Sequence, residues 1–178
     1  KALARHVTAH VHDAMLHSSG GDTHPEESYF VPPLKDRLDT GDLLKFDDAD
    51  WIVVTPRCDL ANAGKVETVL FARCNDIKTE WDLIDEKTRT GADKQRKLMQ
   101  HDRSPKQHFL PQMSLGENTK SGPWMVQFHH LRAMPLGEAL QRAPEDRFAS
   151  LAPQFMPSLL ERFGAYFSRI GTPNVSTE

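Results

Sequence analysis

Three short apolar runs in the middle of the chain restrict its possible folds more than any other feature. They cover residues 42–46, 51–55 and 66–73, and polar turns of four to ten residues separate them. Strands this short, joined by turns this tight, indicate a small antiparallel barrel or a strongly curled sheet. The run Ile52-Val53-Val54 is β-branched and wholly apolar, so we expect its strand to be buried on both faces.

The clearest helix follows this β region near the C-terminus, over about residues 154–170, where apolar residues recur every four positions. We expect this stripe to lie in the main core with Ile52 and Val54. Pro153 and Pro157 are compatible with a helix only near its first turn, so the regular part should begin between them. The stripe consists of Phe155, Leu159, Phe163 and Phe167.

A second helix is predicted within residues 1–21, where Leu3, Val7 and Val11 mark one apolar face. Either the domain's own sheet or a preceding domain must cover this face. The chain does not begin with methionine and the amphipathic pattern is already running at Leu3, so we interpret residues 1–21 as a helix or linker that follows an upstream domain. A tag or cleaved residues would explain the start equally well. Residues 22–178 then form the barrel domain.

Two segments are predicted to lie outside the regular sheet. Residues 22–39 are polar and rich in proline, and Tyr29-Phe30-Val31 within them is an edge strand at best. Residues 85–106 carry seven Lys or Arg against four Asp or Glu. They should form an exposed, charged helical insertion, because residues 86–103 have almost nothing to bury.

Composition is that of an ordinary globular domain. The chain has 178 residues, 38% of them hydrophobic, which is enough for one core. Its net charge of −3 argues against a domain that works mainly by gripping phosphates, although a local basic patch leaves RNA binding open. Cys58 and Cys74 are expected to be free, buried thiols. No apolar run is long enough to cross a membrane and no signal peptide opens the chain, so we expect a cytoplasmic protein.

The turn after the buried strand holds the candidate catalytic residues Arg57, Cys58 and Asp59. In a functional interpretation, Arg57 holds an anion while Asp59 acts as a base or Cys58 as a nucleophile. In a structural interpretation, Asp59 caps the turn and pairs with Arg57, while Cys58 packs inward.

Candidate binding residues lie elsewhere in the chain, on predicted strands and in the basic insertion. There is no Cys-x-x-Cys knuckle and no His-Glu-x-x-His, so we expect no metal site. The sequence also lacks a phosphate-binding loop and a dinucleotide glycine pattern, so we expect no cofactor. The candidate binding residues are His108, His130, Lys94, Arg96 and Lys97.

Two stretches carry a resemblance to a known family. Residues 40–44 read Thr-Gly-Asp-Leu-Leu, and residues 52–56 read Ile-Val-Val-Thr-Pro. Over about residues 40–75 this resembles the opening of the MazF/PemK-like toxin barrels, which implies an SH3-like barrel and RNA cleavage without a metal. The sequence departs from that pattern where Ala49-Asp50-Trp51 replaces the Arg-Pro of the toxins. The turn Cys58-Asp59-Leu60 and residues 169–173 are similar to an uncharacterised bacterial group of barrel-plus-helix domains, which implies an output role behind regulatory modules, including phage-defence systems.

The sequence thus predicts an α+β fold with a small curled antiparallel barrel and leaves two functions open. The first is a non-enzymatic output or interaction domain that binds a protein partner or an upstream domain. The second is a diverged MazF-like nuclease that uses Arg57 and Asp59. The missing Arg-Pro and the acidic charge favour the first. A basic groove beside Asp59, built with Lys94, Arg96 and Lys97, would favour RNA, whereas an apolar patch would favour a protein.

Overall fold

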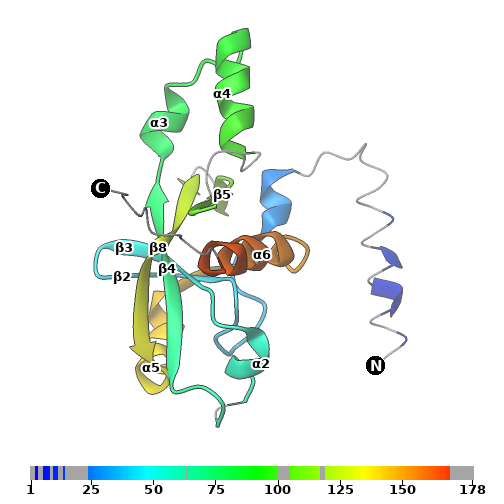
Figure 1. Cartoon of the computed structure of the whole chain (residues 1–178). Coiled ribbons are helices and arrows are strands. Elements are labelled where there is room, and N and C mark those ends of the chain that lie inside the picture. Colours follow the sequence, from blue (N-terminus) through cyan, green and yellow to red (C-terminus); the bar gives the residue numbers. More distant parts are fainter. Residues whose placement is uncertain are drawn as a thin grey trace, which may run out of the picture.

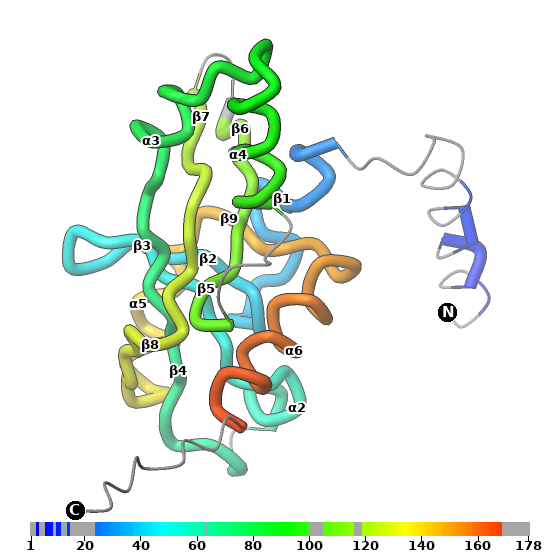
Figure 2. The backbone as a smooth tube through the Cα atoms, turned by 45° about the horizontal axis from the view of Figure 1, so that its top comes forward, coloured from blue at the N-terminus to red at the C-terminus, as the bar shows by residue number. Residues whose placement is uncertain are grey.

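The computed structural model describes residues 24–62, 64–99, 105–116 and 119–168, and positions 3, 6–8, 10, 11 and 14 of the N-terminal segment. Its centre is a seven-stranded antiparallel sheet with the order β1-β9-β2-β3-β4-β8-β5. The sheet curls into a half-barrel, with several helices packed around it (Figures 1 and 2). The expected α+β fold with a curled antiparallel sheet is therefore confirmed. The strands are β1 (Tyr29–Phe30), β2 (Asp42–Phe46), β3 (Ala49–Val53), β4 (Thr68–Asp76), β5 (Gln107–Leu110), β8 (Trp124–Pro135) and β9 (Arg147–Leu151), while β6 (Met113–Gly116) and β7 (Thr119–Ser121) form a separate hairpin.

Each face of the sheet carries its own apolar core, because neighbouring residues of a strand point to opposite faces. Leu43 and Ile52 belong to the core that contains Leu159 of α6 (Met156–Phe167). Leu44 and Trp51 belong to the core that contains two alanines of α5 (Leu136–Asp146). Residues 51–54 are all buried, which confirms the strand expected to be covered on both faces.

The two edge strands of the half-barrel are joined by a side-chain contact. The hydroxyl of Tyr29 in β1 donates a hydrogen bond to the carbonyl oxygen of Pro111, just after β5, at 2.7 Å. Tyr29 is buried, and burial raises the pKa of its hydroxyl well above the ordinary value. The predicted edge strand around Tyr29 is thus confirmed, and its aromatic ring belongs to the core.

The turn between β2 and β3 is tighter than expected. The register pairs Phe46 with Ala49, so only Asp47 and Asp48 form the loop. Both have positive φ angles, 50° and 54°, which suits a two-residue hairpin turn and the tolerance of Asp for this region. Strand β3 therefore begins two residues before the predicted start at Trp51.

Helix α6 begins between the two prolines, as predicted, and Leu159 is fully buried beside Ile52 and Val54. Phe155 and Phe163 pack against the same core while partly exposed. The prediction for Phe167 is wrong, because this side chain is 56% exposed. It lies in the last turn of α6, where its ring contacts the rings of Phe163 and Tyr166.

The charged segment forms α3 (Lys78–Asp82) and α4 (Arg89–Met99), which project away from the end of β4 (Figure 1). Most of their side chains are exposed, as predicted. The N-terminal positions that the structure describes are helical, and Leu3, Val7 and Val11 are exposed there. The domain's own sheet therefore does not cover these three side chains. Cover by a preceding domain stays a prediction.

In the part of the chain that the structure describes, no helix has both the length and the hydropathy to span a bilayer.

Candidate functional site

A loop over residues 31–41 carries most of the candidate site, and a buried ion pair fixes it. Arg147, the first residue of β9, donates from Nη1 to Oδ2 of Asp42 at 3.0 Å. The same guanidinium donates to the backbone carbonyls of Arg37 and Lys35, each at 2.7 Å. The side chains of Arg147 and Asp42 are only 9% and 2% exposed, so the pair is shielded from water. Arg147 therefore anchors the loop to strand β9 of the sheet.

Asp42 also organises the turn that leads into β2. Its Oδ1 accepts from the hydroxyl of Ser150 at 2.5 Å, and its Oδ2 accepts from the backbone N–H of Asp39 at 2.7 Å. Burial raises the pKa of the Asp42 carboxyl, and the hydrogen bonds from Ser150, the Asp39 amide and Arg147 offset this rise only in part.

A glycine and a threonine complete this turn. Gly41 has a φ of 82°, and a Cβ there would lie 2.2 Å from Cε of Met156. The positive φ favours glycine here, because a residue with a Cβ is strained in this backbone conformation. The hydroxyl of Thr40 donates to the carbonyl of Thr55 at 2.6 Å, which ties the loop to the residue that precedes Pro56.

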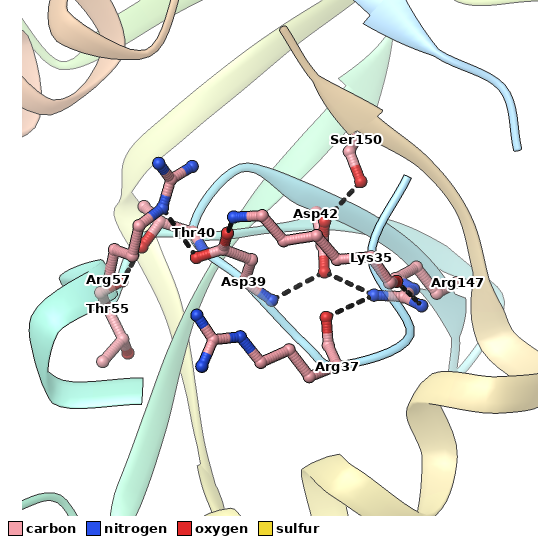
Figure 3. A network of polar contacts seen from close by, with 9 residues as sticks. All are labelled: Lys35, Arg37, Asp39, Thr40, Asp42, Thr55, Arg57, Arg147 and Ser150. Atoms are coloured by element: carbon pink, nitrogen blue, oxygen red, sulfur yellow. Dashed lines mark hydrogen bonds and ion pairs between the residues drawn. The ribbon is translucent and has the colours of Figure 1, made fainter. Parts of the chain in front are cut away.

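Asp39 contacts both Lys35 and Arg57 and lies between their side chains (Figure 3). Its Oδ1 accepts from the Thr40 amide and from Nε of Arg57, each at 3.0 Å, and its Oδ2 accepts from the ammonium of Lys35. Burial alone would raise the pKa of this carboxyl, but the bonds from Lys35 and Arg57 outweigh it and hold the pKa below the ordinary value. Asp39 is therefore a weak base that orients two cations.

These cations open onto a pocket of about 140 Å³, which we call the Asp39 pocket. Arg57 is 49% exposed and Lys35 is 42% exposed, although the carboxylate between them is only 6% exposed. Charged residues form one part of the wall and apolar residues the other. The pocket is lined by Lys35, Asp39, Thr40, Asp42, Arg57 and Ser150, and by Phe30, Leu34, Leu151 and Pro153.

Of the three candidate catalytic residues, only Arg57 lines the Asp39 pocket. Arg57 lies in the Asp39 pocket and pairs with Asp39, not with Asp59 as the structural interpretation expected. Cys58 is exposed, so the prediction that it packs inward is wrong; the short surface helix α2 (Arg57–Leu60) buries none of its residues. The thiol of Cys58 donates weakly to Oδ1 of Asp59 at 3.5 Å. Asp59 is not among the residues that line the Asp39 pocket.

The second predicted thiol, Cys74, is free and buried as expected, and burial raises its pKa well above the ordinary value. Both cysteines are therefore free, but only one belongs to the core.

The candidate binding residues do not join Arg57 either. His108 is buried and lines a separate, mainly apolar pocket of about 250 Å³, while His130 is exposed with its ring edge-on to Trp51 at 5.8 Å. Helix α4, which carries Lys94, Arg96 and Lys97, lies at the opposite end of the molecule from α2 (Figures 1 and 2). The basic groove that would have favoured RNA is thus not built beside Asp59 from these residues.

Local sequence patterns do not single out Lys35, Asp39 or Arg147, although all three belong to the site. The motif Thr40-Gly41-Asp42 carries the family resemblance, and its glycine and its buried carboxylate shape the site. Among the residues that the structure describes, no three His, Cys, Asp or Glu side chains gather closely enough to hold a metal ion.

Comparisons with protein-family models, with curated proteins and with solved structures find no match to this chain.

Proposed function

We propose that this chain is a non-enzymatic interaction domain, acting as the cytoplasmic output module of a larger bacterial signalling or phage-defence protein. The observation that carries the proposal is the state of Asp39. Its two oxygens accept from two cations and a backbone amide, and its pKa is held low. A general base works best with a pKa near the working pH, so this carboxylate is suited to positioning cations and not to taking a proton.

The second acidic group of the cluster is also occupied. Asp42 is buried and accepts from Ser150, Arg147 and the Asp39 amide. These bonds fix the backbone where the chain enters β2. We therefore interpret the charge of Asp42 as structural and not as catalytic. The same residues present two half-exposed cations at a pocket with an apolar wall, which is an arrangement for recognition.

The alternative function is a diverged MazF-like, metal-independent endoribonuclease built on an SH3-like barrel. One observation favours it: Arg57 presents a half-exposed guanidinium on the same short helix as Asp59, after a buried strand, in the region that resembles those toxins. Such a guanidinium can stabilise the charge that develops on a phosphate during cleavage.

The test compares wild type with Asp59→Asn and Arg57→Gln on a mixed RNA pool in the presence of a chelator. We expect none of the three proteins to cleave RNA. Cleavage by wild type that is lost in Asp59→Asn, with an unchanged melting temperature, would reject the interaction domain in favour of the nuclease. Arg132→Gln is the matched control, because Arg132 is also 49% exposed and ion-paired but lies outside the Asp39 pocket.

A further inference from the structure

We propose that the Asp39 pocket binds the C-terminal carboxylate of a peptide whose last residue is apolar. This inference rests on the proposed interaction function and names the chemistry of the partner. Three features of the pocket support it: its charge balance, the orientation of its cations and the apolar character of its remaining wall.

Among the ion-paired side chains of the pocket and the loop beneath it, one positive charge is in surplus. Lys35, Arg57 and Arg147 contribute three positive charges, and Asp39 and Asp42 contribute two negative ones, so the sum is +1. Arg147 and Asp42 neutralise each other in the buried pair beneath the loop. The surplus therefore falls on Lys35 and Arg57, which share the single carboxylate of Asp39. A partly enclosed site with excess positive charge attracts an anion.

The orientation of Arg57 leaves part of its guanidinium for a ligand. Arg57 contacts Asp39 through Nε, and its two terminal nitrogens are directed away from Asp39 (Figure 3). An arginine with its terminal nitrogens available can bind a carboxylate with a fork of two donors. Asp39 holds the guanidinium of Arg57 in place. The buried pair of Arg147 and Asp42 holds the loop that carries Asp39. Because the cations are positioned in advance, a ligand loses less entropy when it binds.

The remaining wall of the pocket is apolar, which indicates what accompanies the carboxylate. Phe30, Leu151 and Pro153 line it, and Leu34 at its rim is 71% exposed. A terminal carboxylate next to an apolar side chain matches both walls at once, and capture of a peptide terminus by preorganised donors is a common recognition mode. RNA fits less well. Its phosphates repeat along a strand and need a basic track, whereas the basic helix α4 lies at the other end of the molecule.

The test is a titration of the ¹⁵N-labelled chain with N-acetyl-leucine, followed by two-dimensional NMR. We expect shifts at the amides of Thr40, Gly41 and Arg57, with a dissociation constant on the order of 1 mM, a usual strength for so small a ligand. N-acetyl-leucinamide, which lacks the carboxylate, and acetate, which lacks the apolar group, should each bind at least about tenfold more weakly.

Two variants and two matched controls locate the binding. Arg57→Gln and Lys35→Gln should each weaken binding of N-acetyl-leucine by about tenfold or more. Lys35 and Lys78 both pair with an Asp four residues later and have similar exposure, so Lys78→Gln is the control for Lys35→Gln. Arg132→Gln is the control for Arg57→Gln. Both controls should bind as wild type does. A melting curve for each variant separates lost binding from lost folding.

Several results would overturn the inference. One is that N-acetyl-leucinamide binds as tightly as N-acetyl-leucine. Another is that both pocket variants bind N-acetyl-leucine as wild type does. A third is that no amide signal shifts when the concentration of N-acetyl-leucine is 20-fold above about 1 mM. Inorganic phosphate that binds the pocket when N-acetyl-leucine does not would instead point to a nucleic-acid backbone. If N-acetyl-leucine does not bind and the RNA is not cleaved, only the peptide ligand is rejected. If the RNA is cleaved, the proposed function itself is rejected.

Discussion

Replacing Arg147 with methionine tests whether the buried ion pair holds the loop that carries the site. Methionine keeps a similar apolar length but removes the charge and the three donated hydrogen bonds. Asp42, whose side chain is 2% exposed, would then be a buried carboxylate without a counter-ion. Breaking one side of a buried pair costs about 3–5 kcal/mol. We expect about 3 kcal/mol, because Asp42 keeps its bonds from Ser150 and the Asp39 amide, and water can reach the freed carbonyl of Arg37.

The assay is urea unfolding followed by tryptophan fluorescence, since Trp51 and Trp124 are both buried. The loss of unfolding free energy in Arg147→Met, relative to wild type, should become smaller as the pH falls. The folded-state pKa of Asp42 is already above its ordinary value of 3.8, and it rises further once the positive charge is gone. A folded state that binds a proton more tightly than the unfolded chain gains stability as the pH falls through that raised pKa. The gap between wild type and variant should therefore shrink between pH 7 and about pH 4.5.

A second change separates this electrostatic cost from lost packing. Asp42→Asn in the Arg147→Met background removes the orphaned charge, so the two changes together should cost about 1–3 kcal/mol less than the sum of their separate effects. Three results would refute the reasoning: a loss of unfolding free energy below about 1 kcal/mol at pH 7 in Arg147→Met, a loss that does not change with pH, or strictly additive effects of the two substitutions.

Three further predictions concern the packing of the fold, and urea or thermal unfolding checks each. Leu159→Ala should cost about 2–5 kcal/mol and more than Phe163→Ala, because Leu159 is fully buried and Phe163 is only partly so; the reverse order would place the core elsewhere. Gly41→Ala should destabilise by about 2 kcal/mol or more, owing to its positive φ and crowded surroundings, while Gly164→Ala in α6, with open space around it, should stabilise by about 0.5–1 kcal/mol; similar effects at both glycines would contradict this. Replacing residues 86–103 with a short Gly-Ser linker should leave the melting temperature nearly unchanged, and a fall of more than about 10 °C would show that this segment supports the core.

The parts of the fold that sequence reasoning found are those whose pattern is local. Strand β2 and the start of α6 were predicted because hydrophobic periodicity and proline positions report directly on the backbone. Helix α5 and strand β9 were missed for a physical reason. The buried residues of α5 are Ala139 and Ala143, so its apolar face is small, and Pro144 lies within it. No strong stripe marks such a helix in the sequence.

The candidate site was only partly predictable, because its partners are distant in sequence. Arg57 could be noticed as a reactive residue on a turn, but its partner Asp39 lies 18 residues earlier and Arg147 enters from a strand 105 residues after Asp42. Asp59 is close to Arg57 in the sequence and lies on the same turn, so sequence reasoning favoured it as the partner of Arg57. Antiparallel pairing of β2 with β9 decides the outcome, since it brings Ser150 and Arg147 beside the loop.

The most direct test of the account is the pKa of Asp39 itself, measured by carbon-detected NMR titration of its carboxyl group. The proposed function requires this carboxylate to orient Lys35 and Arg57 and not to accept protons. We expect a pKa below the ordinary value of 3.8 in wild type, and a higher pKa in Arg57→Gln, where one of the two cations is gone. Arg132→Gln should leave it unchanged. A wild-type value of about 6–7, in the range of a working general base, would contradict the account and return the Asp39 pocket to the class of catalytic sites.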